Sequence, residues 1–125
     1  MDKQSITRGR EDFLEAVLML SKRKPRVKSI EIANILGISK PAVSRQIADL
    51  IAKGLIIKEG PTNICLTEAG LGLAEKVLEK HETLKAFLLK LGVSYDVADV
   101  DCCKIEHVIS DETFSKIKEF LNGKE

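Results

Sequence analysis

Residues 29–54 have the sequence SIEIANILGISKPAVSRQIADLIAKG, and this stretch determines the expected fold. Its first part predicts a short helix that ends at Gly37, because glycine readily takes the left-handed conformation that follows a helix. Ser39 suits the N-cap of a second helix, and Pro41 is tolerated in that helix's first turn, where its missing N–H costs nothing. A short helix, a tight turn and a longer helix that ends at Gly54 form the helix-turn-helix arrangement.

The residues on either side of this pair extend it into a larger unit. Residues 55–59 (LIIKE) and 64–66 (ICL) favour strands, and the GPTN sequence between them favours a turn. Upstream, the apolar residues of 8–22 recur at helical spacing. A hairpin directly after the second helix makes the unit a winged helix-turn-helix with a two-stranded wing.

The remaining sequence predicts helices only. A long helix capped by Thr67 is expected to end at Leu91 before Gly92, a second covers Tyr95 to about Val108, and a third covers Asp111 to Leu121. We therefore expect a mainly α fold, with a winged helix-turn-helix DNA-binding domain at 1–70 and an all-helical dimerisation and metal-binding domain at 71–125.

The composition is that of an ordinary globular protein. Hydrophobic residues make up 44% of the 125 residues, charged residues 31% and aromatic residues only 4%, which favours helices with aliphatic cores. The net charge of +1 provides no general attraction to nucleic acid, so DNA binding would depend on local basic surfaces. Two such clusters are present: Lys22, Arg23, Lys24, Arg26 and Lys28, and Lys40, Arg45 and Lys53.

The sequence also predicts where the protein resides and how it assembles. The N-terminus lacks a signal-peptide pattern, no apolar run is long enough to cross a membrane, and three cysteines form no even disulfide framework. We therefore expect a cytoplasmic protein with reduced thiols and no membrane partner. Because a small helical domain buries little core alone, we also expect a homodimer, which suits two-fold symmetric DNA sites.

The start of the second helix of the pair is the expected reading surface. The N-terminal turns of a recognition helix meet base edges in the major groove, and the exposed candidates there are Ser39, Lys40, Pro41, Ala42, Ser44 and Arg45. Arg45 can make a bidentate contact to guanine, whereas Lys40 suits phosphates. The alternative is that these residues are merely the solvated side of a packed helix.

A second cluster, Cys103-Lys104-Ile105-Glu106-His107, predicts a metal site. The spacings i, i+3 and i+4 place Cys103, Glu106 and His107 on one helical face, where a thiolate, a carboxylate and an imidazole suit a transition metal. Cys102 is expected to point elsewhere as a small buried side chain, because adjacent helical residues diverge. Cys65, in the expected wing, is interpreted as structural.

Five segments together resemble the diphtheria toxin repressor family of metal-dependent regulators, including its manganese-transport-regulator branch. They occur in the order expected for that family: EDFLE at 11–15, SKPAVS at 39–44, LTEAG at 66–70, KHE at 80–82 and CKIEHVIS at 103–110. The resemblance covers nearly the whole chain. The chain ends near Glu125, so we expect it to lack the SH3-like third domain of longer members.

The resemblance implies a homodimeric repressor of metal homeostasis that binds double-stranded operator DNA when loaded with iron(II) or manganese(II), with no small-molecule substrate. The metal ligands implied by position are Asp12, Glu15, His81, Cys103, Glu106 and His107. Asp12 and Glu15 resemble the manganese branch and Cys103 the iron branch, so iron(II) is the first expectation and manganese(II) the second, while zinc, nickel or cobalt can bind in vitro. Lys85 stands where iron-branch members offer a carboxylate to an ancillary site.

Three other classes of function fit parts of the sequence. A winged-helix regulator that senses an organic ligand or an oxidant through its cysteines would need no metal. A metal-dependent enzyme is disfavoured, because no general base remains once the carboxylates bind the metal and no phosphate-cradling loop is present. A winged helix used only for protein contacts would show no salt-dependent binding to duplex DNA.

Overall fold

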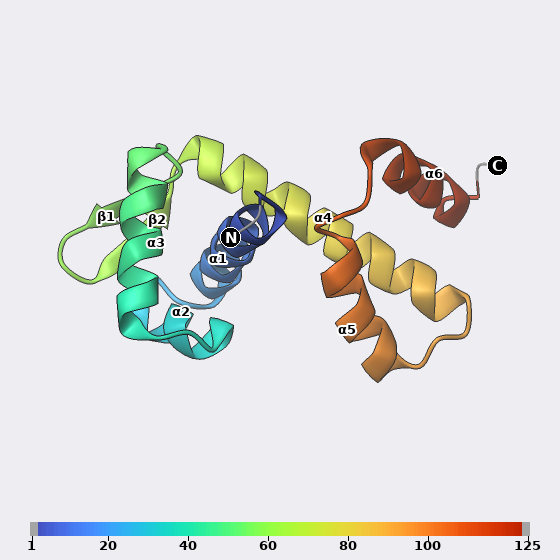
Figure 1. Ribbon diagram of the computed structural model, residues 1–125, viewed down its shortest axis with the longest axis horizontal. Coiled ribbons are helices and arrows are strands. Elements are labelled where there is room, and N and C mark those ends of the chain that lie inside the picture. Colours follow the sequence, from blue (N-terminus) through green and yellow to red (C-terminus); the bar gives the residue numbers. More distant parts are fainter. Residues whose placement is uncertain (1–2, 124–125) are drawn as a thin grey trace. The chain divides into compact units, whose positions relative to one another are not determined.

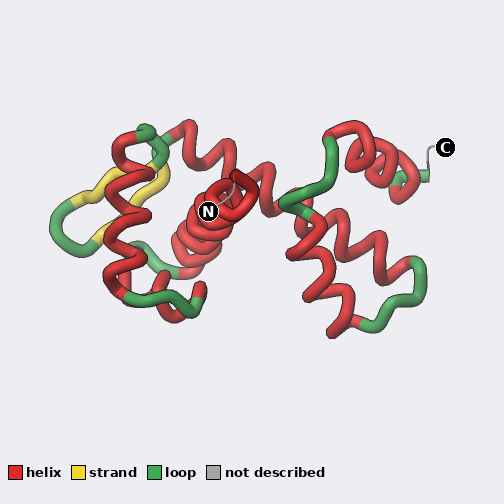
Figure 2. Tube along the Cα trace, viewed as in Figure 1, coloured by secondary structure: helices red, strands yellow, loops and turns green. Residues whose placement is uncertain are grey.

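A computed structural model describes the backbone of residues 3–123 and the side chains of residues 8–123. The fold is mainly helical, with one hairpin (Figures 1 and 2). It divides into two compact units between Glu75 and Lys76, inside a continuous helix. In chain order the elements are α1 (Lys3–Arg23), α2 (Ser29–Leu36), α3 (Lys40–Ala52), β1 (Ile56–Glu59), β2 (Asn63–Leu66), α4 (Glu68–Lys90), α5 (Tyr95–Ile105) and α6 (Asp111–Leu121).

Helix α1 supplies much of the core of the first unit. Phe13, Leu14 and Val17 are fully buried, and the spacing of these residues places them on one apolar side of the helix. The helix contacts α2, α3 and β2. The amphipathic pattern in the sequence therefore marks a central packing helix.

The helix-turn-helix forms as the sequence predicts. Helix α2 ends at Gly37, whose φ of 65° is left-handed, and Ser39 caps α3 by accepting a hydrogen bond from the Ala42 N–H at 3.3 Å. Val43, Ile47 and Leu50, spaced four and three residues apart, are the buried residues of α3. The opposite side of α3 is therefore left exposed along its whole first half.

The wing is a short antiparallel hairpin. β1 pairs with β2 so that Ile56 faces Leu66 and Glu59 faces Asn63. Asn63 also accepts a hydrogen bond from the Val27 N–H at 2.9 Å, and the Ile64 N–H donates to the Val27 carbonyl at 2.9 Å. These bonds attach the loop that precedes α2 to the wing. The prediction of a mainly α winged helix-turn-helix is confirmed.

The second unit is built from the C-terminal half of α4 together with α5 and α6. Its core is formed by Leu84, Cys102 and Phe114, one from each helix. Ser110 begins α6 by accepting a hydrogen bond from the Thr113 N–H at 3.1 Å. Among the described residues, no helix combines the length and the apolarity that a membrane crossing requires.

Two helix boundaries differ by three residues or more from those expected. Helix α1 begins at Lys3 instead of residue 8, since the polar residues before Arg8 carry no apolar periodicity that sequence reasoning could use. Helix α5 ends at Ile105 instead of Val108. There the chain tightens into a turn, in which the N–H groups of Val108 and Ile109 both donate to the Ile105 carbonyl at 3.0 Å.

The start of α4 is locked to the end of α3 by a close approach. Thr67 Oγ1 donates to the Gly54 carbonyl at 2.7 Å and accepts from the Gly70 N–H at 3.1 Å. A Cβ at Gly70 would lie 1.9 Å from the carbonyl oxygen of Leu55, which is backbone and has no freedom to move aside. Glycine is therefore required at this position by packing.

Replacing Gly70 with alanine should destabilise the protein by roughly 1–3 kcal/mol, because the backbone must shift to relieve the overlap. Gly72→Ala is the matched control in the same helix, since its Cβ would meet nothing within 4 Å. Alanine there should raise stability by up to about 1 kcal/mol through its helix propensity. Urea unfolding of both variants measures the difference, and equal stability of the two would contradict this packing.

Candidate metal centre and nucleic-acid interface

The predicted reading surface is accessible on α3. Ser39, Lys40, Pro41, Ser44 and Arg45 are exposed at the start of the helix, and Ala42 is half-buried. Ser39 Oγ already accepts the cap hydrogen bond from the Ala42 N–H, and its hydroxyl hydrogen remains available to donate. Contact of these residues with DNA stays a prediction.

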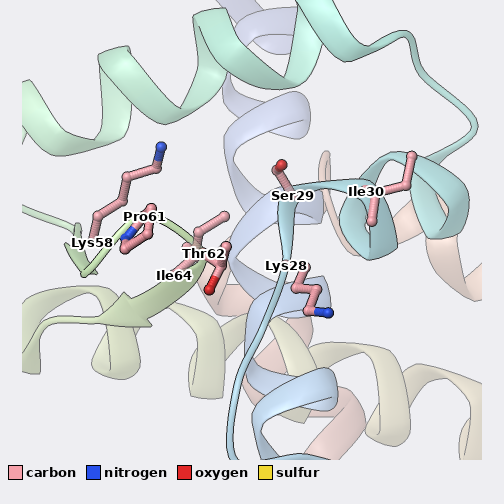
Figure 3. Close-up of a pocket in the computed structure, with 7 residues that line it drawn as sticks. All are labelled: Lys28, Ser29, Ile30, Lys58, Pro61, Thr62 and Ile64. Carbon is pink, nitrogen blue, oxygen red and sulfur yellow. The ribbon is translucent and has the colours of Figure 1, made fainter.

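A pocket of about 190 Å³ lies between the start of α2 and the wing (Figure 3). Lys28 and Lys58 contribute ammonium groups, and Ser29 and Thr62 contribute hydroxyls. The full lining is Lys28, Ser29, Ile30, Lys58, Pro61, Thr62 and Ile64. Sequence reasoning named Lys28 within a basic cluster but missed Lys58 and Thr62, because only the hairpin brings the wing beside α2.

In the second unit, the ring of His81 on α4 meets three donor groups that follow or belong to α5. Its Nδ1 lies 3.1 Å from Oε2 of Glu106, 3.5 Å from Sγ of Cys103 and 3.6 Å from Sγ of Cys102. The donor atoms of the histidine and the two cysteines all lie within 4.8 Å of one another. The structure therefore brings together three of the predicted ligands, His81, Cys103 and Glu106, and their binding of a metal stays a prediction.

Cys102 was expected to point away from this cluster, and that expectation is wrong. Its side chain is fully buried, but its sulfur lies 3.6 Å from Nδ1 and 3.8 Å from Nε2 of the same histidine that Cys103 approaches. Side chains at adjacent helical positions diverge by about 100°. An imidazole ring that lies between the directions of the two cysteine side chains can contact both sulfurs. Sequence spacing alone does not reveal where such a ring lies.

Glu106 is the C-cap of α5 and is almost completely buried, with 3% of its surface exposed. One carboxylate oxygen faces His81, and the other lies 3.3 Å from Nε2 of His107. Because α5 ends early, His107 occupies the turn after the helix and not its last turn. A buried carboxylate between two imidazoles is a costly arrangement unless positive charge compensates it.

The far side of the His81 ring faces an ion-pair network. Nε2 lies 3.9 Å from Oδ1 of Asp99, which Lys85 holds at 2.9 Å, and Lys85 also donates to the Tyr95 hydroxyl at 3.1 Å. The lysine hydrogen bond lowers the pKa of Asp99 and so keeps it ionised. Lys85 thus presents a cation that is already paired with Asp99.

Proton affinities in this region suit metal ligation by the histidine. Burial, followed by the nearby charge of Lys85, lowers the pKa of His81, so its ring is neutral at pH 7 and its lone pair is available. Burial, followed by the charge of Glu106, raises the pKa of the Cys102 thiol. That thiol remains protonated in the metal-free protein.

The two remaining predicted ligands, Asp12 and Glu15, lie on α1 in the first unit. They are half-buried and three residues apart, so they share one face of that helix. Oδ2 of Asp12 also lies 3.8 Å from Nε of Arg8. Their part in a metal site stays a prediction.

Cys65 is confined to the wing and takes no part in the cluster. It lies on β2 opposite Ile57, and its Sγ donates to Oε1 of Glu59 at 3.1 Å. Burial and the carboxylate of Glu59 raise its pKa. This thiol is a protonated hydrogen-bond donor, consistent with a structural role.

The chain joins a winged helix-turn-helix, whose α3 is exposed, to a helical unit that gathers imidazole, thiol and carboxylate groups. This combination defines the class of metal-responsive transcriptional regulators. Comparison with known proteins supports this class. Residues 67–124 match the family model described as "Iron dependent repressor, metal binding and dimerisation domain", and residues 15–63 match the MarR family.

Similar proteins include regulators from archaea and bacteria. An uncharacterized HTH-type transcriptional regulator of Methanocaldococcus jannaschii is 37% identical over 113 residues, covering 89% of this chain and 90% of the relative. The transcriptional regulator MntR of Escherichia coli O157:H7 is 32% identical, covering 88% of this chain and 71% of the relative. The chain belongs to the diphtheria toxin repressor family of metal-dependent transcriptional regulators, and its relatives are regulators and not enzymes, as predicted.

Solved structures of metal-dependent regulators are similar to this chain as well. The manganese regulator SloR superposes with a TM-score of 0.81 at 30% identity, covering 90% of this chain and 53% of SloR. IdeR of T. acidophilum also gives a TM-score of 0.81, at 25% identity, covering 90% of this chain and 53% of IdeR. This chain therefore spans about half the length of these two structures.

Proposed function

We propose that this protein is a repressor of metal homeostasis that binds operator DNA as a homodimer when loaded with iron(II) or manganese(II). The observation that carries the proposal is the convergence of His81, Cys103 and Glu106 in a chain that also exposes the first half of a recognition helix. Nitrogen, sulfur and oxygen donors around one point fit a divalent transition metal.

The proposed ligands are the six implied by family position. Within the second unit these are His81, Cys103, Glu106 and His107, and Asp12 and Glu15 of α1 complete the set. Carboxylates drawn together without a cation repel one another and resist desolvation. A bound divalent cation supplies the positive charge that removes this repulsion.

Ligands donated by both units would couple metal binding to DNA binding. Carboxylates of α1, when they share a cation with the second unit, restrict how the DNA-binding unit moves. In a homodimer this restriction favours recognition helices separated by about one DNA turn, roughly 34 Å. Reciprocity then requires operator DNA to tighten metal binding by the same factor.

Exposed apolar side chains support the homodimer. Val97 and Val100 lie three residues apart on α5 with 49% and 54% of their surfaces exposed, and Val108 beyond the helix is 60% exposed. Apolar side chains grouped on one helix are typical of protein contact surfaces. A second copy of the chain is the partner that the family and the two-fold symmetry of operators favour.

The choice of metal follows from the donors. Cys103 favours iron(II) over manganese(II), and the carboxylates accept both. Zinc, nickel and cobalt should also bind in vitro, because they stand high in the general affinity order of divalent metals. Availability in the cell would then select the activating ion.

Operator selection tests the whole proposal. Random duplexes are selected with iron(II), with manganese(II) and with a chelator, and affinity for the enriched sequence is then measured by fluorescence anisotropy. We expect a two-fold symmetric site that is bound tightly only with metal. Equal affinity in the presence of chelator would refute metal dependence, and a response to thiol modification alone would favour an oxidant sensor.

Replacing His107 with alanine should abolish the dependence of operator affinity on metal, because the proposed site loses one of its nitrogen ligands. Lys104→Ala, an exposed position on the neighbouring turn, is the control and should keep the dependence. Operator affinity is measured over a manganese(II) titration. An unchanged titration curve for the histidine variant would remove His107 from the ligand set.

Replacing Arg45 with alanine should relax base selection at one position of each half-site by about 1–3 kcal/mol, the worth of one bidentate guanine contact. Lys116→Ala removes one positive charge from an exposed site on α6 and serves as the control. Binding to a set of single-base operator variants is the measurement. A uniform loss of affinity across all variants would instead assign Arg45 to the phosphate backbone.

A further inference from the structure

We infer that Cys102 is a metal ligand together with Cys103 and His81, so that the second unit holds a thiolate-rich site that prefers thiophilic divalent ions such as zinc and iron(II) to manganese(II). The inference deepens the proposed function at its own site and rests on it only for the regulatory consequence. The six family positions include one cysteine, whereas this chain places two sulfurs against the histidine.

The geometry of the donors carries the inference. Nδ1 of His81 lies 3.5 Å from Sγ of Cys103 and 3.6 Å from Sγ of Cys102, and Sγ of Cys102 also lies 3.8 Å from Nε2, so both sulfurs lie against the imidazole ring. All three donor atoms fall within 4.8 Å of one another. Donors that share one ion at about 2.0–2.3 Å have separations of this order.

The other ring nitrogen has the partner that a metal-binding histidine usually has. Nε2 of His81 faces the carboxylate of Asp99 at 3.9 Å, and Lys85 holds that carboxylate at 2.9 Å. Ligand histidines commonly direct their second N–H to a carboxylate, which fixes the ring orientation and the tautomer. When a metal ion takes the lone pair of Nδ1, Nε2 carries the ring proton and Asp99 is the carboxylate that it faces.

Charge and access also fit a divalent ion. Two thiolates and a neutral imidazole balance a charge of +2, and each S–H bond that is replaced by a sulfur–metal bond releases its proton to water. The carboxylate of Glu106 lies 3.1 Å from Nδ1 of His81, close enough to supply a fourth donor atom. Cys102 is fully buried, but the His81 side chain is 18% exposed and Cys103 is half-buried, which leaves a path from solvent.

Counting sulfur ligands in the wild-type chain tests the inference without a variant. The full-length reduced protein is loaded anaerobically with one equivalent of zinc(II), and the X-ray absorption fine structure gives the number of sulfur scatterers. Two sulfurs are expected. A single sulfur, or none, would overturn the inference and leave Cys102 as a small buried side chain.

Cobalt(II) spectra of variants assign the sulfurs. The near-ultraviolet charge-transfer band grows with each thiolate bound, so Cys102→Ser and Cys103→Ser should each lose about half of it. Cys65→Ser, the matched control on the wing, should keep the full band. An unchanged band in the Cys102 variant would contradict the inference, and Cys102→Ala keeps the test available if serine disturbs the core.

Affinities separate this inference from the proposed function. Loss of Cys102 should weaken zinc(II) binding by roughly tenfold or more, because losing even a residue that only supports a ligand costs about that much metal affinity. Manganese(II) binding should stay nearly unchanged. Equal losses for both ions would contradict the inference. Metal-activated operator binding that survives in Cys102→Ala supports the repressor function independently. A wild-type protein whose operator affinity rises with neither iron(II) nor manganese(II) refutes that function without changing the sulfur count.

Discussion

The packing of α4 against α5 in the second unit creates the constraint on which the site depends. Leu84 and Cys102 share a core with Phe114, and this core fixes the rotation of the two helices about their axes. His81 stands one helical turn before Leu84, so the same rotation directs its ring at α5. The meeting of His81 with two sulfurs and the Glu106 carboxylate is therefore a consequence of ordinary hydrophobic packing.

The fold of the first unit could be predicted because its signals are local. Gly37, Ser39 and Pro41 specify the turn and the start of α3 through backbone chemistry that acts within a few residues. The α6 boundary at Ser110 was predictable for the same reason. Where local signals were absent, as in the polar residues before Arg8, the predicted boundary was wrong.

The candidate site was only partly predictable, because it depends on contacts distant in sequence. Spacing identified Cys103, Glu106 and His107, and family position identified His81. Spacing also misassigned Cys102, since helical periodicity describes the direction of a side chain but not the partner that approaches it. The Asp99–Lys85 pair behind the ring joins α5 to α4 and has no signature in either segment alone.

The division of donors between the units has a physical meaning in the proposed function. Soft donors gathered within one unit can provide most of the binding free energy for an ion, because they are preorganised by a single core. In that proposal, the hard carboxylates on α1 would add ligation only in the arrangement that α1 must adopt for DNA binding. Because an effector shifts an equilibrium only by its difference in affinity between two states, the α1 carboxylates, and not the thiolates, would carry the regulatory signal. Selectivity for the ion and response to it would thus reside on different helices.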